Sequence, residues 1–399
     1  MKPRWHALGV MFVIQCVGSL TFLSLTVLTP FIKSDFGVST SDIGFLVTAL
    51  YLGYFLSLTP GGILTDFAGE RFTLALGMTT VGLVAVTLSI FPMYWMLCSG
   101  VFLLGLGYGT IPSGTNKGIF DWFPSEQRTI GISIKQTGVM FGGAIGAAFL
   151  PALAELTGWR SVWGIVSSLA FATLGVLYVY SPGEQPSGRW LPPHDRIVGK
   201  FKRMHGLASE PGVLPLLVSG VLFGMSQFTI MAYIVLYLTE NLFLAPAVAG
   251  VLYTGMQLAG IVSRIGLGFL TDSLFAENKQ LVLAGLGIVG FVFFLPMALF
   301  TANTGLPIVV GVLVVVGAVS LGYNGVYLTI AGELAGDEDA GVATGMGVAA
   351  VMAGAVLFPP VFGFIVEATG SYSLPLGAIG LITLGAGVSA VRVGRSVPR

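Results

Sequence analysis

Two basic residues, Lys135 and Arg264, fall well inside long apolar segments of this 399-residue chain. A charge near the centre of a bilayer costs at least about 2.5 to 3.5 kcal/mol on insertion scales, so each residue is a candidate for function. Every Asp and Glu lies in a loop or near the end of an apolar segment. Uncompensated cations in a low-dielectric cavity attract anions, and arginine holds a carboxylate or oxyanion through two parallel hydrogen bonds. These residues therefore predict a site for a small anion.

Each cation also has a structural alternative. Arg264 can pair with carbonyl groups at a helix end or with Asp272, although an interval of eight residues makes that direct bond strained. Lys135 can extend its long stem to the membrane interface. Lys135 follows Arg128 by seven residues, and Arg264 precedes Asp272 by eight. At 1.5 Å per residue, Lys135 and Arg264 therefore both lie roughly 10 to 12 Å from the cytoplasmic border of the membrane. The similar depth, in opposite halves of the chain, supports treating the two cations together.

Tyrosine hydroxyls and side-chain amides inside the apolar segments can complete such a site, because they donate hydrogen bonds to anion oxygens. For any single tyrosine the alternative is helix packing or a place in the interfacial aromatic belt. Tyr323 and Asn324 are favoured because they lie in a glycine-flanked stretch at mid-span. The predicted substrate-binding residues besides Arg264 and Lys135 are Tyr51, Tyr54, Tyr108, Gln136, Gln227, Gln257, Tyr323, Asn324 and Tyr327.

Membrane-spanning helices must position these side chains. Hydrophobic residues make up 55% of the chain and charged residues only 9%, against about 25% charged in soluble domains. Apolar runs of roughly 20 residues, enough to cross about 30 Å of hydrocarbon, recur along the chain. The first run, from Leu8 to Ile32, is too long for a signal-peptide core and is predicted to be retained. Twelve predicted spans begin near residues 8, 43, 72, 95, 129, 160, 213, 246, 280, 305, 342 and 373.

The basic residues outside the spans are distributed unevenly. An even number of spans puts both termini on one side of the membrane, and most of these basic residues lie on that side. Only Lys33 and Arg160 lie on the other. The positive-inside rule therefore predicts cytoplasmic termini for an all-α, multi-pass protein of the inner (cytoplasmic) membrane.

The chain divides near its middle and its halves repeat. The Pro- and charge-rich segment 182–212 is predicted to be a cytoplasmic linker between a six-helix bundle at 1–181 and another at 213–399. The segments GGILTD, LGYG and ELTG of the first half return in the same order as GFLTD, LGYN and EATG in the second. Many secondary transporters are built from such repeated halves, with the substrate site at their interface.

The loop GGILTDFAGER resembles the signature loop of the major facilitator superfamily, and a weaker copy follows the eighth span. The resemblance covers essentially the whole chain and implies twelve helices in two pseudo-symmetric bundles, with rocker-switch transport by alternating access. In the family the loop Asp caps a neighbouring helix and pairs with basic groups, which latches one conformation. The latch residues implied here are Gly62, Asp66, Gly69, Arg71, Gly268 and Asp272.

Two further segments are similar to those of anion porters. SRIGLGFLTD, which contains Arg264, resembles the eighth span of monocarboxylate, oxalate/formate, cyanate and nitrate porters. GISIKQTGVMFGGA, which contains Lys135, is similar to the fifth span of bacterial cyanate-permease relatives. In those families the arginine serves the substrate anion, which implies the same role for Arg264. The Gly-Pro pair of drug/proton antiporters and a sugar-porter signature are both missing, which disfavours those substrates.

Energy coupling and rival functions are less constrained. Proton-coupled transporters generally titrate an intramembrane Asp, Glu or His, and none is placed inside a span here. We therefore hypothesise that the anion neutralises the cavity and lets the halves close, as in exchange against a counter-anion, facilitated diffusion, or symport with a cation. The alternatives are an exporter of neutral or amphiphilic molecules on the same fold, and a non-transporting receptor.

The sequence also indicates which partners to expect. It contains no nucleophile–base pair, metal-ligand cluster or phosphate-binding loop. We therefore expect no enzyme activity, no cofactor, no metal and no nucleic-acid partner. The expected protein is a monomer in a lipid bilayer with a small anionic substrate.

Overall fold

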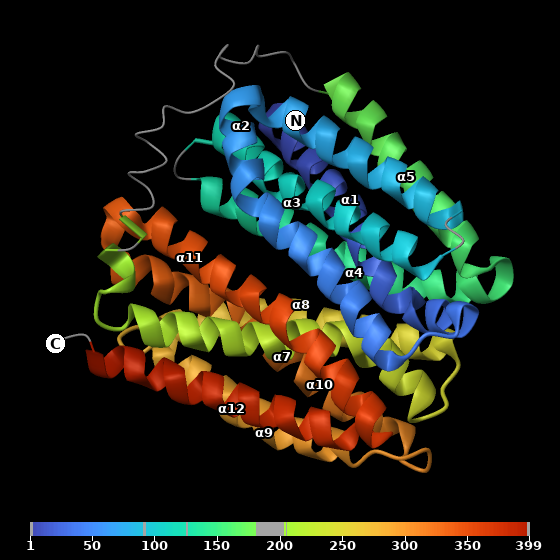
Figure 1. Ribbon diagram of the computed structural model, residues 1–399. Coiled ribbons are helices and arrows are strands. Elements are labelled where there is room, and N and C mark those ends of the chain that lie inside the picture. Colours follow the sequence, from blue (N-terminus) through green and yellow to red (C-terminus); the bar gives the residue numbers. More distant parts are fainter. Residues whose placement is uncertain (1–2, 91–92, 125–126, 181–202, 205, 397–399) are drawn as a thin grey trace. The chain divides into compact units, whose positions relative to one another are not determined.

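The computed structural model describes residues 3–90, 93–124, 127–180, 203–204 and 206–396 (Figure 1). Within these ranges, eleven helices are long and apolar enough to cross a membrane. The predicted linker 182–212 lies largely outside the described residues. The helices are α1 (Pro3–Phe36), α2 (Thr40–Ile90), α3 (Tyr94–Trp122), α4 (Arg128–Thr157), α5 (Trp159–Tyr180), α7 (Val213–Glu240), α8 (Pro246–Leu274), α9 (Gln280–Ala298), α10 (Leu306–Gly322), α11 (Asn324–Thr369) and α12 (Ser373–Ser396).

These eleven helices contain the twelve predicted spans. Helix α2 has 51 residues, and a straight helix of that length would measure about 77 Å, more than twice the hydrocarbon thickness. It is interrupted at Gly69, whose φ of 81° and ψ of 164° are not helical. Glycine adopts a positive φ without the steric penalty of a side chain, so Gly69 separates the second span from the third. Another span, Leu306–Ala335, joins α10 to the start of α11, and Gly341–Thr369 forms the next.

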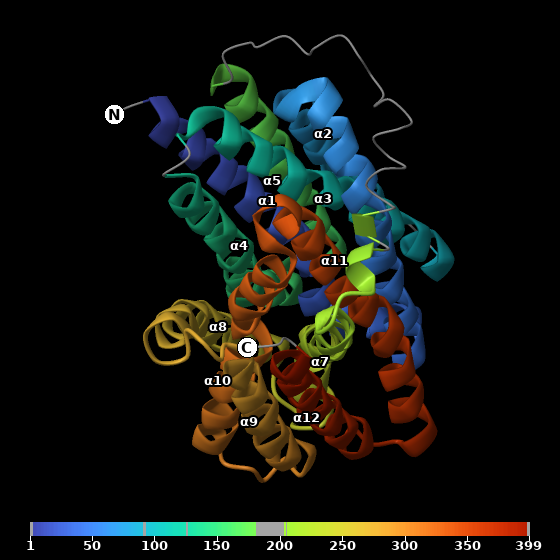
Figure 2. The same ribbon diagram turned by 90° about the vertical axis from the view of Figure 1, so that its left-hand side faces the viewer.

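The described helices form two compact units. Unit 1 contains α1, α3, α4, α5 and α2 from Phe45 onward, and unit 2 contains α7, α9 to α12 and α8 from Gly255 onward. In unit 1, α1 packs against α3, α4 and α5; in unit 2, α7 packs against α10, α11 and α12. Figures 1 and 2 show α9 and α12 side by side in unit 2. The first span of each half thus contacts the fourth, fifth and sixth, as expected for a repeat.

Glycines permit the closest of these helix contacts. A Cβ atom on Gly142 of α4 would lie 2.1 Å from the carbonyl oxygen of Cys16 on α1. A Cβ atom on Gly354 of α11 would lie 2.2 Å from the carbonyl oxygen of Val221 on α7. Small residues at such positions let helix backbones touch. The first and fifth spans of both halves therefore pack at the same kind of glycine contact.

Gly142→Ala is expected to destabilise unit 1, because the added methyl group must push α4 away from α1. Overpacking of this kind typically costs about 1–3 kcal/mol. The measurement is the thermal unfolding midpoint of the purified protein in detergent. Gly146→Ala in the same helix is the matched control, since its Cβ would meet its nearest neighbour, Leu150 Cδ1, at 3.6 Å. Equal midpoints for the two variants would contradict the proposed contact.

Candidate functional site

Lys135 is fully buried inside unit 1. Its side chain has a relative exposure of 0%, and its Nζ donates to Asn116 Oδ1 at 2.8 Å and to Thr115 Oγ1 at 3.3 Å. Both acceptors lie on α3 and both are neutral. The lysine therefore does not extend to the membrane interface, and α3 holds its amine in place.

A chain of neutral polar groups continues from this amine. Thr115 Oγ1 donates to Gln15 Oε1 at 3.1 Å, and Gln15 Nε2 donates to the Tyr108 hydroxyl at 3.4 Å. The hydroxyls of Tyr108 and Ser19 lie 2.9 Å apart. Helices α1, α3 and α4 are thus joined by one hydrogen-bonded chain. Of its members, sequence analysis identified Lys135 and Tyr108 and missed the rest.

The three predicted tyrosines of unit 1 all pack against the ring of Phe22 on α1. The Phe22 ring lies 5.6 Å from Tyr51, 5.5 Å from Tyr54 and 4.3 Å from Tyr108, measured between ring centroids. In unit 2, Tyr323 stacks on Phe223 of α7 at 4.6 Å. Tyr108 and Tyr323, which the repeated segments predict to correspond, therefore both stack on a phenylalanine of the first span of their half.

Arg264 on α8 is half-buried in unit 2. Its Nη2 donates to the carbonyl oxygen of Leu321, in the last turn of α10, at 3.1 Å. Its Nε is buried without a hydrogen-bond partner. No carboxylate pairs with Arg264 in the part of the chain that the structure describes, and Asp272 is exposed. Of the two structural alternatives, the helix-end carbonyl is present and the pair with Asp272 is not. Most of the five guanidinium donors remain available.

Gln227 on α7 adds an oriented amide to this cluster. The Tyr323 hydroxyl donates to Gln227 Oε1 at 2.9 Å, and Asn324 Nδ2 donates to the same oxygen at 3.1 Å. Two donors on the oxygen fix the orientation of the amide, so Nε2 points away from them. Its recorded partner there is the sulfur of Met231 at 3.9 Å, a weak acceptor. Arg264 meets the chain on both sides of Tyr323: its Nη2 donates to the Leu321 carbonyl oxygen, and its Cγ lies 3.9 Å from the position of a Cβ atom on Gly325. The guanidinium and the Gln227 amide therefore lie against the same short segment, 321–325.

Of the remaining predicted site residues, Tyr327 lies beside this cluster, with its ring centroid 6.2 Å from that of Tyr323. Tyr327 is buried, and its hydroxyl donates to the Gly347 carbonyl oxygen at 3.4 Å. Gln257 is buried within α8. Gln136 is exposed on α4, on a different face from its buried neighbour Lys135.

Of the implied latch residues, Gly62, Asp66, Gly69 and Arg71 lie on α2 around the turn at Gly69, and Gly268 and Asp272 lie on α8. The carboxylates of Asp66 and Glu70 interact electrostatically with the ammonium of Lys117 on α3, which also forms an ion pair of 2.9 Å with Asp121. The Arg71 guanidinium lies 5.5 Å from the Tyr178 ring centroid on α5. In unit 2, Gly268 has open space around its Cβ position. The ion pair near the corresponding end of α8 is formed by Lys279 and Glu333. The role of these residues as a latch stays a prediction.

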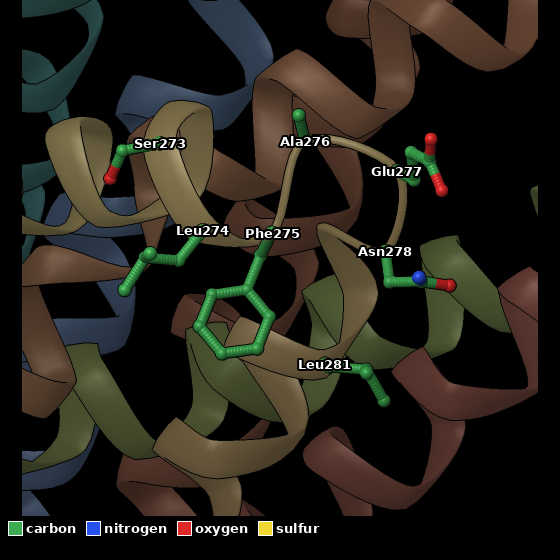
Figure 3. A pocket seen from close by; sticks show the side chains of 7 residues that line it. All are labelled: Ser273, Leu274, Phe275, Ala276, Glu277, Asn278 and Leu281. Atoms are coloured by element: carbon green, nitrogen blue, oxygen red, sulfur yellow. The ribbon is translucent and has the colours of Figure 1, made fainter.

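A shallow depression of about 360 Å³ lies at the end of α8 (Figure 3). It is lined by Ser273, Leu274, Phe275, Ala276, Glu277, Asn278 and Leu281. Neither Lys135 nor Arg264 lines it, and its single charged residue is an acid. It is therefore a poor candidate for an anion site.

The protein has twelve apolar spans in two repeated units, and each unit contains a buried or half-buried basic residue. These features are those of a multi-pass membrane carrier. The chain belongs to the Major Facilitator Superfamily, whose model matches residues 10–350 and 216–399. The fold, the transporter class and the family predicted from the sequence are therefore confirmed.

Individual relatives and structures agree with this assignment. A probable sulfoacetate transporter of Cupriavidus necator is 25% identical, in an alignment that covers 98% of this chain and 93% of that protein. The chloroplastic probable anion transporter 4 of Oryza sativa is 24% identical over 74% of this chain and 53% of its own length. A crystal structure of a bacterial homologue of the human lysosomal transporter Spinster, inward-facing and occupied, superposes with a TM-score of 0.83 at 16% identity, over 100% of this chain and 98% of that one. That likeness establishes the fold.

Proposed function

We propose that this transporter carries a small anion across the cytoplasmic membrane by alternating access, with Arg264 as the principal substrate-binding residue. The observation that carries the proposal is the state of the guanidinium. It is half-buried, its Nη2 donates one hydrogen bond to a backbone carbonyl, and its Nε has no hydrogen-bond partner. An anion would satisfy both its charge and its remaining donors.

The surrounding groups favour an acceptor-rich ligand. The oxygen of Gln227 already accepts two hydrogen bonds, so the amide has only N–H groups to offer a ligand. Together with Arg264 this makes a site of donors. Carboxylates, sulfonates and inorganic oxyanions carry only acceptors and match it, whereas a cation does not. The names of the relatives, which refer to sulfoacetate and to anions, agree with this class.

In the proposed cycle, anion binding compensates the charge of Arg264 and thereby favours the conformational change that carries the site across the membrane. Lys135 adds a second positive charge in those states of the cycle in which it is protonated, and Tyr51, Tyr54, Tyr108 and Tyr323 line the pathway. The turn around Asp66 and Arg71 acts as the latch, and both termini face the cytoplasm. A counter-anion or a co-transported cation balances the charge.

A thermal-shift screen of the purified protein in detergent tests the proposal. The panel contains sulfoacetate, small carboxylates, phosphate, nitrate and cyanate, with acetamide and glycerol as neutral analogues. A ligand at 100 times its Kd stabilises the folded protein by about 2.7 kcal/mol. We expect at least one anion to raise the unfolding midpoint of the wild type and of the control Arg392→Gln, and to raise that of Arg264→Gln much less or not at all. A shift from neutral solutes alone would instead support an exporter of neutral molecules. An anion shift that is undiminished in Arg264→Gln would give Arg264 a structural role.

A further inference from the structure

The hydrogen bonds of Lys135 match an unprotonated amine. A lysine ammonium has three N–H donors, whereas the neutral amine has two donors and a lone pair. The structure provides two acceptors, Asn116 Oδ1 and Thr115 Oγ1. An ammonium in this place would keep one buried donor without a partner and a full charge without a counter-ion, both of which are unfavourable in an apolar interior.

Among the residues that the structure describes on the neighbouring helices, no carboxylate pairs with Lys135. Lys117 pairs with Asp121, and Arg160 pairs with Asp35, while Tyr108 reaches Lys135 only through neutral groups. The amine is fully buried, and none of the ion pairs among the described residues includes it. The titratable residues with described side chains on α4 and on the helices in contact with it are Arg4, His6, Cys16, Lys33 and Asp35 of α1, Tyr94, Cys98, Tyr108, Lys117 and Asp121 of α3, Arg128 and Glu155 of α4, Arg160 and Tyr178 of α5, and Tyr253 of α8, whose neighbour Thr254 donates to the Ala144 carbonyl oxygen.

We propose that Lys135 is a proton-binding site of the transport cycle. In the packing described here it is the neutral amine, held by Asn116 and Thr115. When α4 moves away from α3 and water reaches the amine, the lone pair of Nζ takes up one proton from water and forms the ammonium. When the helices pack again, that proton returns to water.

The geometry couples this protonation to helix movement. Both acceptors lie on α3 and the lysine lies on α4, so separation of the two helices lengthens both hydrogen bonds together. Hydration favours the ammonium and burial favours the amine. By linkage, protonation and separation of the helices must therefore favour each other. The lysine would supply the proton linkage for which transporters commonly use an intramembrane Asp, Glu or His.

The site can be tested without any transported anion. The measurement is the thermal unfolding midpoint of the full-length protein in detergent, from about pH 5.5 to about pH 9, because a group that binds fewer protons when folded makes stability rise with pH. The midpoint of the wild type minus that of Lys135→Met is expected to rise across this range by about 2 °C or more. Arg264→Gln should show the same rise as the wild type, so a failure here is distinct from a failure of the proposed anion site.

Two matched variants sharpen the result. Asn116→Asp places a carboxylate where Nζ now meets the Asn116 oxygen at 2.8 Å, which holds the lysine as an ammonium and is expected to remove the rise. Lys135→Arg cannot lose its charge and is expected to be less stable than the wild type, most of all at high pH. If Lys135→Met does not fold, the comparison of wild type with Asn116→Asp decides. A wild-type curve that runs parallel to that of Lys135→Met, or of Asn116→Asp in its absence, overturns the proposal.

Discussion

Replacing Arg264 with glutamine is expected to weaken anion binding by about 30-fold to several thousand-fold. Removing one partner of a buried, hydrogen-bonded charge pair costs about 2–5 kcal/mol, and every 1.4 kcal/mol is about tenfold in affinity. The fold should tolerate the change, because Arg264 makes one recorded hydrogen bond to the protein, to the Leu321 carbonyl, and glutamine can donate there as well.

Arg264→Lys should fall between the wild type and Arg264→Gln. Lysine keeps the positive charge but loses the planar fork that holds an oxyanion through two bonds. Isothermal titration of the purified variants with the most stabilising anion of the screen measures the series, and Arg392→Gln controls for the loss of an arginine elsewhere. An unchanged affinity in Arg264→Gln would place Arg264 in a purely structural role at the end of α10.

Gln227→Glu is expected to abolish anion binding while leaving the fold intact. A carboxylate at this position still accepts the hydrogen bonds that Tyr323 and Asn324 donate to Gln227 Oε1. It also replaces the amide N–H donors with a negative charge. Like charges placed together cost several kcal/mol, so the affinity for an anion should fall at least about 100-fold.

Gln227→Leu separates the two contributions of that amide. It removes the N–H donors without adding charge, so it should weaken the anion less than Gln227→Glu does. It also leaves the buried Tyr323 hydroxyl without its acceptor, which typically costs about 1–3 kcal/mol of stability. The unfolding midpoint and the anion affinity of both variants are the measurements. An affinity in Gln227→Glu equal to that of the wild type would exclude the amide from the site.

The spans were predictable because the bilayer fixes their length and polarity. Runs of about 20 apolar residues can be read directly from a sequence, and the repeated segments placed Tyr108 and Tyr323 in matching positions. The boundaries between neighbouring spans were harder to predict. The second and third spans are continuous in α2 except at Gly69, because a single glycine with positive φ suffices for the reversal.

The candidate site was predictable only in part. Arg264 stood out because a charge inside a span is costly. Gln15, Ser19, Thr115 and Asn116 did not, since neutral polar residues are common in transmembrane helices and their role depends on which helix face meets which neighbour. The spacing of four between Gln15 and Ser19, which puts both on one face, was the available signal. Rise per residue gave the depth of Lys135 but not its rotation toward α3.

Flux through the protein itself tests the central claim most directly. The purified carrier would be reconstituted in liposomes, and uptake of the isotopically labelled anion that gives the largest thermal shift would be followed with and without excess unlabelled anion. We expect saturable uptake that the unlabelled anion competes away and that falls to the level of protein-free liposomes in Arg264→Gln. Undiminished uptake in that variant, or uptake of neutral solutes alone by the wild type, would contradict the account.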